Sequence, residues 1–146
     1  MSAETNTIAS NLKHLFTLPL FTGIQAGLPA PSGDYFEREI DLNELLIDKP
    51  AATFYIRVTG DSMDRAYVPP GALVMIDRSI TPCNGSIVLA VVDGEFTLKR
   101  LEIRGTQRRL CPDSNNPKHK PVDINEFTQC EIWGVARHLI IDAKTV

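Results

Sequence analysis

One short turn signal, Asp93-Gly94, constrains the fold of this chain more than any other feature. It separates two β-type runs, Ile87 to Val92 and Glu95 to Leu101, and an Asp-Gly pair in that setting is the strongest short-range signal for a β-hairpin. A two-residue turn also fixes the register, so Val88 is predicted to face Lys99. The chain is therefore expected to contain an antiparallel sheet built around this hairpin.

Other segments also favour strands. Thr53 to Thr59 alternates in the manner of a half-buried strand, whereas Leu73 to Ile76 is a continuous apolar run, as expected of a strand covered on both faces. Ile132 to Ile141 is predicted to be a last long strand, with a bulge or bend at Gly134. The fold class that these patterns predict is mostly β.

The N-terminal region has a different character. Residues 1–36 show no sustained period and include the Pro/Gly/Ser stretch Gly27 to Gly33, so they predict a flexible N-terminal arm. Residues 37–146 are then expected to form one compact domain. A short helix from Asp41 to Ile47 is predicted near its start, because Asp41 suits an N-cap and Pro50 follows the end.

Composition narrows the classes of function. The net charge of −3 gives no electrostatic reason to bind nucleic acid, so direct sequence-specific DNA binding is not expected. The three cysteines and three histidines share no ligand spacing, so we expect reduced thiols, no metal and no cofactor. No apolar run approaches the roughly 18 residues that span a bilayer, and the interpretation is a cytoplasmic protein without a membrane anchor.

Lys99 is unusual because it lies mid-strand on an apolar face of the predicted hairpin. Its neighbours there are Val88, Ala90, Thr97 and Leu101. One interpretation is an edge-strand lysine that extends to water and prevents aggregation. The other is a general base, because burial lowers a lysine pKa by as much as three to five units in the extreme case.

Ser62 follows the predicted strand and Gly60, a residue that permits a sharp change of direction. Asp61-Ser62-Met63 is predicted to begin a helical turn, where backbone amides lack partners and favour negative charge. Such amides could hold the oxyanion of an acyl-transfer reaction, whereas the alternative makes Ser62 or Asp61 an ordinary helix cap.

Many short segments follow one another in the order and spacing typical of one family. They are Leu20-Phe21, Gly27 to Pro31, Asp34-Tyr35, Ile40 to Ile47, Gly60 to Met63, Asp93 to Arg100, Asn116-Pro117, Pro121-Val122 and Trp133 to Val135. Through them the chain resembles the self-cleaving serine–lysine peptidases of the LexA/UmuD kind, and the UmuD-like members most closely. The resemblance implies a compact LexA-like C-terminal peptidase fold of twisted antiparallel sheets with one or two short helices.

The resemblance also implies roles for individual residues. Ser62 would be the nucleophile and Lys99 its general base, with the backbone amides of Ser62 and Asp61 as the oxyanion hole. The bond cut would be Ala26-Gly27 in the arm. The processed chain would form a homodimer and join an error-prone Y-family (UmuC-like) translesion polymerase in the SOS response, after a RecA–single-stranded-DNA filament promotes cleavage.

Two features depart from the family pattern. Arg65 to Ala72 replaces an acidic, glycine-containing turn, and His119 stands where relatives often have tyrosine, without an implied role. Three alternatives stay open at this point: a LexA-type transcriptional repressor, a catalytically silent accessory module of the polymerase, and a membrane signal peptidase. The repressor would need a DNA-binding domain, for which the residues before Ala26 are too few.

Overall fold

The computed structural model describes residues 16–23 and 35–144 of the chain. The chain divides into two compact units, with the boundary between Asp48 and Lys49. The sequence predicts a different kind of boundary, the end of a cleavable arm between residues 36 and 37, and that boundary stays a prediction. Within the described residues, none of the helices has the length and apolar character needed to cross a membrane.

The first unit contains a two-stranded antiparallel sheet. Strand β1 (Leu18–Phe21) pairs with β2 (Phe36–Ile40), and the rings of Phe21 and Phe36 meet edge to face with their centroids 6.1 Å apart. Strand β1 lies within residues 1–36, where the sequence shows no sustained period, and the flexibility of that arm stays a prediction. Only four residues long, β1 is too short to show a period in the sequence, and its pairing depends on a partner in β2.

Helix α2 (Leu42–Leu46) follows β2 and confirms the predicted short helix. The Asp41 carboxylate accepts a hydrogen bond from the amide of Asn43 at 2.9 Å, as an N-cap residue does. The C-cap residue is Ile47, in extended conformation.

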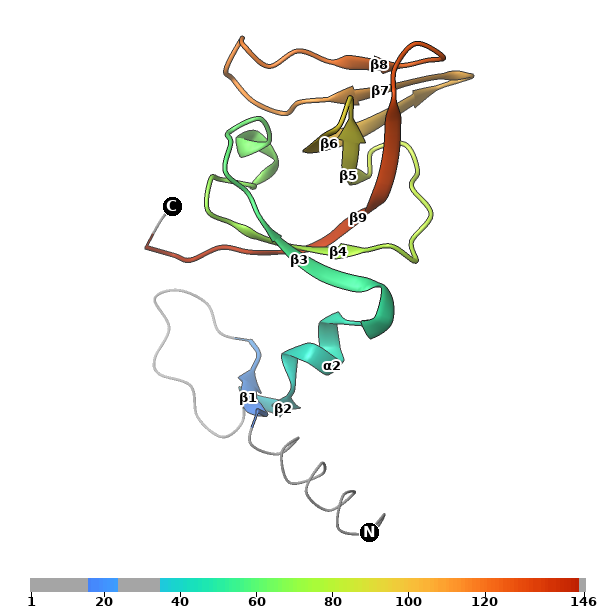
Figure 1. Ribbon diagram of the computed structural model, residues 1–146. Coiled ribbons are helices and arrows are strands. Elements are labelled where there is room, and N and C mark those ends of the chain that lie inside the picture. Colours follow the sequence, from blue (N-terminus) through green and yellow to red (C-terminus); the bar gives the residue numbers. More distant parts are fainter. Residues whose placement is uncertain (1–15, 24–34, 145–146) are drawn as a thin grey trace. The chain divides into compact units, whose positions relative to one another are not determined.

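The second unit is built on a seven-stranded, fully antiparallel sheet, which confirms the mostly-β prediction. The strand order is β3-β4-β9-β5-β6-β7-β8. The strands are β3 (Thr53–Arg57), β4 (Leu73–Asp77), β5 (Ile87–Val92), β6 (Glu95–Arg104), β7 (Gln107–Cys111), β8 (Val122–Ile124) and β9 (Cys130–Ile140), and two short 3-10 helices are η2 (Pro50–Ala52) and η3 (Asp64–Ala66). Figure 1 shows the long β9 bending through this unit, beside β4 at one end and β5 at the other.

The hairpin of β5 and β6 has the predicted register. Val88 faces Lys99 and Ala90 faces Thr97 across the pair. Asp93 and Gly94 form the turn with φ angles of +49° and +88°, and positive φ at both central residues is what a two-residue hairpin turn of this twist requires.

The bend expected in β9 occurs where Trp133 is the extra residue of a bulge, because Leu89 pairs with Gly134 and Ala90 with Ile132. At Gly134 the reason for glycine is close packing: a Cβ atom there would lie 2.5 Å from Cγ2 of Ile76. A missing side chain therefore lets β9 approach β4 at this point.

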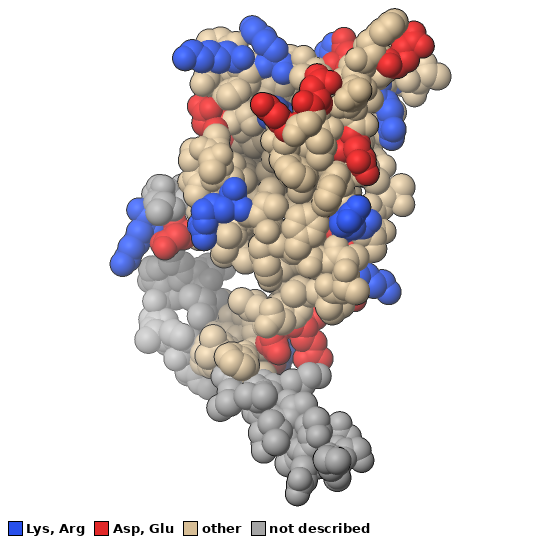
Figure 2. Space-filling view, viewed as in Figure 1, with Lys and Arg blue, Asp and Glu red and all other residues tan. Residues whose placement is uncertain are grey.

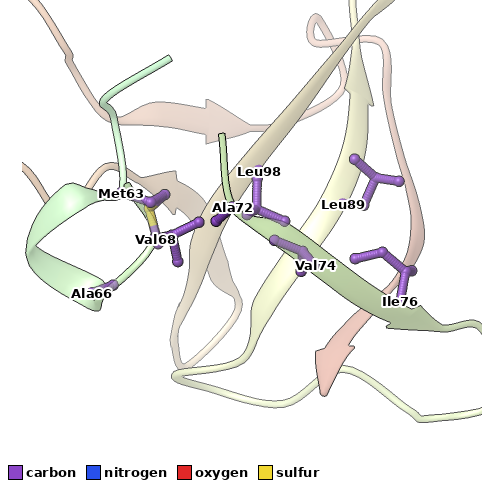
Figure 3. Packing of buried hydrophobic residues seen from close by; sticks show 8 residues of the cluster. All are labelled: Met63, Ala66, Val68, Ala72, Val74, Ile76, Leu89 and Leu98. Atoms are coloured by element: carbon purple, nitrogen blue, oxygen red, sulfur yellow. The ribbon is translucent and has the colours of Figure 1, made fainter. Parts of the chain in front are cut away.

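Apolar side chains cover both faces of the β5–β6 hairpin. One cluster includes Leu89 and Leu98, and the other includes Val88, Ala90 and Leu101. Figure 3 shows the first cluster, in which Met63 and Val68 from the segment after Ser62 lie beside Ala72, and Ala66 belongs to the same cluster. The residues around Ser62 are thus anchored in the core of the second unit.

Candidate active site

Lys99 lies in the middle of β6, against residues that are removed from water. Val88 and Leu101 are fully buried beside it, as the hairpin register predicts. Lys99 itself is half-buried, and this burial lowers the pKa of its amine below the ordinary value for lysine. The shift has the direction that a general base needs.

Three oxygen atoms surround the Lys99 amine. Nζ lies 2.9 Å from Ser62 Oγ and 2.6 Å from Thr97 Oγ1. The third neighbour is the carbonyl oxygen of Leu98, at 3.3 Å. A neutral amine has two N–H donors and one lone pair, so Thr97 and Leu98 can accept both hydrogens while the lone pair faces the Ser62 hydroxyl. The arrangement therefore suits proton transfer from Ser62 to Lys99.

Ser62 sits on a turn between β3 and η3. The amide of Asp64 donates to the Asp61 carbonyl at 3.3 Å, which closes the turn, and η3 begins only at Asp64. The predicted helical turn is present, but it starts two residues after Ser62 and has three residues. So short a helix sums few peptide dipoles, and oxyanion stabilisation at Ser62 would depend on individual amides.

The loop after β7 holds the Ser62 turn through the backbone. The amide of Asp113 donates to the Ser62 carbonyl at 2.8 Å, and the amide of Arg65 donates to the Asp113 carbonyl at 2.9 Å. The Asp113 side chain also meets that of Arg100, the residue after Lys99, at 3.5 Å. These contacts tie the Ser62 turn to the strand that carries Lys99.

Side chains from the same loop bind the residue before the serine. His119 Nε2 lies 2.6 Å from Asp61 Oδ1, and Asn116 Nδ2 donates to Asp61 Oδ2 at 3.2 Å. The hydrogen bond to His119, and after it the one to Asn116, holds the pKa of Asp61 below its usual range. Sequence reasoning gave His119 no role, because no pattern in the chain relates it to Asp61.

An open cleft of about 540 Å³ contains the Ser62 hydroxyl and the Lys99 amine. His119 lines it as well, and most of the rest of its wall is apolar. The apolar wall residues are Phe54, Ile56, Val58, Met63, Leu89, Phe96, Leu98 and Trp133. Phe96 and Trp133 meet edge to face, with ring centroids 5.3 Å apart. The mostly apolar lining suits small or apolar side chains.

Arg65 to Ala72, where the sequence departs from the family pattern, contributes three residues to the core cluster that contains Met63, a residue of the cleft wall. Ala66, Val68 and Ala72 are buried in the core beside Met63. Tyr67 between them is 80% exposed and left-handed, with φ of +65°. The altered turn therefore still anchors the segment after Ser62 in the apolar core.

Comparison with known proteins identifies the family. The model of the Peptidase S24-like family matches residues 19–137. The chain belongs to this family. ImpA of Salmonella typhimurium is 43% identical over 126 residues, covering 86% of this chain and 84% of ImpA. SamA of Salmonella typhimurium strain LT2 is 48% identical over 112 residues, covering 76% of this chain and 80% of SamA.

A repressor is also similar. LexA repressor 1 of Geobacter sulfurreducens is 37% identical over 108 residues, which are 74% of this chain and 52% of the repressor. The resemblance drawn from the sequence motifs is confirmed: the chain is a UmuD-like member of the S24 peptidases, a family of serine peptidases.

The sequence-predicted site residues fall into two groups. Ser62 and Lys99 come together in the cleft, and Asp61 lies beside them with its side chain bound by the β7–β8 loop. Ala26 and Gly27, the predicted cleavage site, lie outside the described residues. Among the described residues, no three His, Cys, Asp or Glu side chains gather in a way that could hold a metal ion.

Proposed function

We propose that this chain is a self-cleaving serine peptidase in which Ser62 and Lys99 form the catalytic dyad. The observation that carries the proposal is the 2.9 Å separation between Lys99 Nζ and Ser62 Oγ in a cleft of a Peptidase S24-like chain. Lys99 is half-buried and has a lowered pKa, so it can act as the base that activates a serine hydroxyl within hydrogen-bond reach.

The reaction would be one acyl transfer per chain. Neutral Lys99 takes the hydroxyl proton of Ser62, and Oγ attacks the carbonyl carbon of Ala26. The amides of Ser62 and Asp61 would hold the resulting oxyanion. When the C–N bond breaks, Lys99 gives its proton to the Gly27 amine, leaving an acyl-enzyme at Ser62.

Water completes the cycle by hydrolysing the ester, with Lys99 again accepting a proton. The products would be residues 1–26 and residues 27–146. Because the substrate is tethered to the site, the effective concentration is high and modest chemical activation is enough. The step open to control is therefore how often the cleavage segment occupies the cleft.

The wider role is proposed from the family. Similarity to UmuD-like proteins and to a LexA repressor supports an SOS-related function. In the proposed role, a RecA–single-stranded-DNA filament promotes cleavage in the cytoplasm. The processed homodimer then serves an error-prone, UmuC-like Y-family polymerase in translesion synthesis.

The test is the intact mass of the purified chain with and without the activated RecA filament. The proposal predicts that the wild-type chain is cut between Ala26 and Gly27 into two fragments. Ser62→Ala and Lys99→Ala should yield no fragments. A wild-type chain that stays whole both with the filament and at alkaline pH would instead favour a catalytically silent accessory module.

A transcriptional repressor is the second candidate, because LexA repressor 1 is 37% identical to this chain. The alignment covers only 52% of that repressor, so the similarity concerns about half of its length and not the whole repressor. Tight binding of the purified chain to an operator duplex in a gel-shift assay would support this alternative, and the proposed self-cleaving subunit predicts none.

A further inference from the structure

We propose that His119 is a positioning residue that fixes the Ser62 nucleophile through the carboxylate of Asp61. The inference rests on the proposed function in one respect, that Ser62 is the nucleophile. It adds a role for a loop, residues 112–121 between β7 and β8, that neither the motifs nor the family comparison assigns.

The β7–β8 loop presents His119 and Asn116 together. Its own hydrogen bonds shape it: the His119 amide donates to the Asn116 carbonyl at 3.2 Å, and the Lys118 amide donates to Asn116 Oδ1 at 3.0 Å. The Asn116 amide donates to Ser114 Oγ at 3.1 Å. Because the loop is internally bonded, the two side chains approach Asp61 from a fixed base.

Asp61 is held at both ends. One carboxylate oxygen contacts His119, the other accepts from Asn116, and the Asp61 carbonyl accepts from the Asp64 amide. The next carbonyl, that of Ser62, accepts from Asp113. The peptide on each side of the serine is thus fixed, which sets the direction in which Oγ leaves the backbone.

Direction matters because the Ser62 hydroxyl must meet the Lys99 lone pair on one side and the substrate carbonyl on the other. Misplacement of a reacting atom by about 1 Å can cost on the order of a hundredfold in rate. Removing His119 leaves Asp61 with Asn116 alone, so the turn gains freedom at the residue before the nucleophile.

The contact with Asp61 does not depend on the charge of the imidazole. A carboxylate only accepts, so Nε2 carries the hydrogen in the neutral ring and in the imidazolium alike. Lys118 and Lys120 flank His119 in the sequence, and Lys99 and Arg57 line the same cleft as His119. Protonation of Asp61 would weaken the contact, because the carboxyl group then loses its charge, and the lowered pKa of Asp61 confines that change to acid solution.

Stability should be little affected, since the side chains of His119 and Asp61 are 28% and 41% exposed. Pairs that accessible to water contribute little to the free energy of unfolding. A positioning role can therefore be distinguished from a structural one. Removal of the His119 side chain should lower the reactivity of Ser62 and leave the unfolding temperature unchanged.

The experiment measures how fast diisopropyl fluorophosphate labels Ser62 between pH 7 and 10, by intact mass. Relative to wild type, His119→Ala should lower the plateau rate about tenfold, the effect of losing one charge-assisted hydrogen bond. His119→Gln keeps an N–H donor and should stay within about threefold. The pH midpoint set by Lys99 and the unfolding temperature should not move, and Ser62→Ala gives the background.

The pathway through Asp61 is tested by a second pair. In an Asp61→Ala background, adding His119→Ala should cause no further loss. Equal labelling of wild type and His119→Ala, or equal losses in His119→Ala and His119→Gln, would overturn the role of His119 and leave the dyad standing. A wild-type chain labelled no faster than Ser62→Ala would overturn both the dyad and this role.

Discussion

The Lys99 amine lies 2.9 Å from the Ser62 hydroxyl, although one residue is in the middle of β6 and the other is on a turn after β3. Two features bring them together. The hairpin register places the lysine on an apolar face, and the β7–β8 loop holds the serine turn by backbone hydrogen bonds. The site therefore depends both on the local register of a hairpin and on long-range contacts from the β7–β8 loop.

Removal of the amine should abolish self-cleavage. Among the described residues, Nζ of Lys99 is the side-chain group that hydrogen-bonds to Ser62 Oγ, and a general base contributes about a hundred- to ten-thousandfold. We expect Lys99→Ala to reduce the cleavage rate by at least that lower factor, as measured by gel densitometry over time at pH 9. Because Lys99→Ala no longer buries an amine, the variant should be at least as stable as wild type in urea unfolding. Cleavage of the alanine variant at the wild-type rate would contradict the assignment.

Cleavage should speed up with pH. The pKa of Lys99 is lowered by burial, so the reactive neutral fraction grows as pH rises towards that pKa, about tenfold per pH unit, and then levels off. The levelling point should lie below the ordinary lysine value and coincide with the titration of the Lys99 Nζ signal in ¹⁵N NMR of Ser62→Ala. A rate that is flat or falls across this range would exclude lysine as the base.

The same burial affects stability. In the window between the lowered pKa and the ordinary lysine pKa, the unfolded chain binds more protons than the folded one, so the free energy of unfolding should increase with pH. Lys99→Met has no such group and should lose this component of the slope. Urea unfolding of both chains at several alkaline pH values measures the difference, and identical slopes would contradict the burial.

Thr97 should affect the cleavage rate, because its Oγ1 lies 2.6 Å from Lys99 Nζ and accepts a hydrogen bond from the amine. Thr97→Val keeps the shape and removes the acceptor, so the amine is less well oriented and the plateau rate should fall three- to tenfold. The lost hydrogen bond stabilises the charged amine more than the neutral one. The pKa of Lys99, and with it the pH midpoint of the cleavage rate, should therefore also decrease. Thr97→Ser retains the hydroxyl and serves as the matched control, with wild-type values expected in the same pH series.

The Lys99 environment could be predicted from sequence because a two-residue turn fixes every cross-strand pair. Counting from Asp93-Gly94 gave Val88 opposite Lys99, and the structure has that pair. Thr97 follows by the same reasoning, since residues two apart share a face of a strand. Its hydrogen bond to the amine was still missed, because the count gives the face and not the rotamer.

The loop contacts could not be predicted in this way. Asp61 and His119 are 58 positions apart, and their meeting depends on where the irregular β7–β8 loop turns back. Likewise β1 pairs with β2 across residues 24–34, and four residues are too few to show a period. Periodic patterns reach neighbours within an element or a hairpin, whereas these contacts depend on tertiary structure.

Gly134→Ala should destabilise the second unit by about 1–3 kcal/mol, the usual cost of overpacking. The added Cβ would lie 2.5 Å from Cγ2 of Ile76, and this atom sits in the packed core. Gly60→Ala is the control for stability, because nothing lies within 4 Å of a Cβ built there. In an Ile76→Ala background the penalty should largely disappear in urea unfolding; a penalty unchanged in that background would place the strain elsewhere.

The most direct test of the catalytic account uses the purified chain alone at alkaline pH. Mass spectrometry should find residues 27–146, with Gly27 as the new N-terminus, accumulating in the wild-type chain and absent from Ser62→Ala after the same incubation. Cleavage of the Ser62→Ala chain at the same bond and the same rate would contradict the account, because the hydroxyl 2.9 Å from Lys99 would then have no part in the reaction.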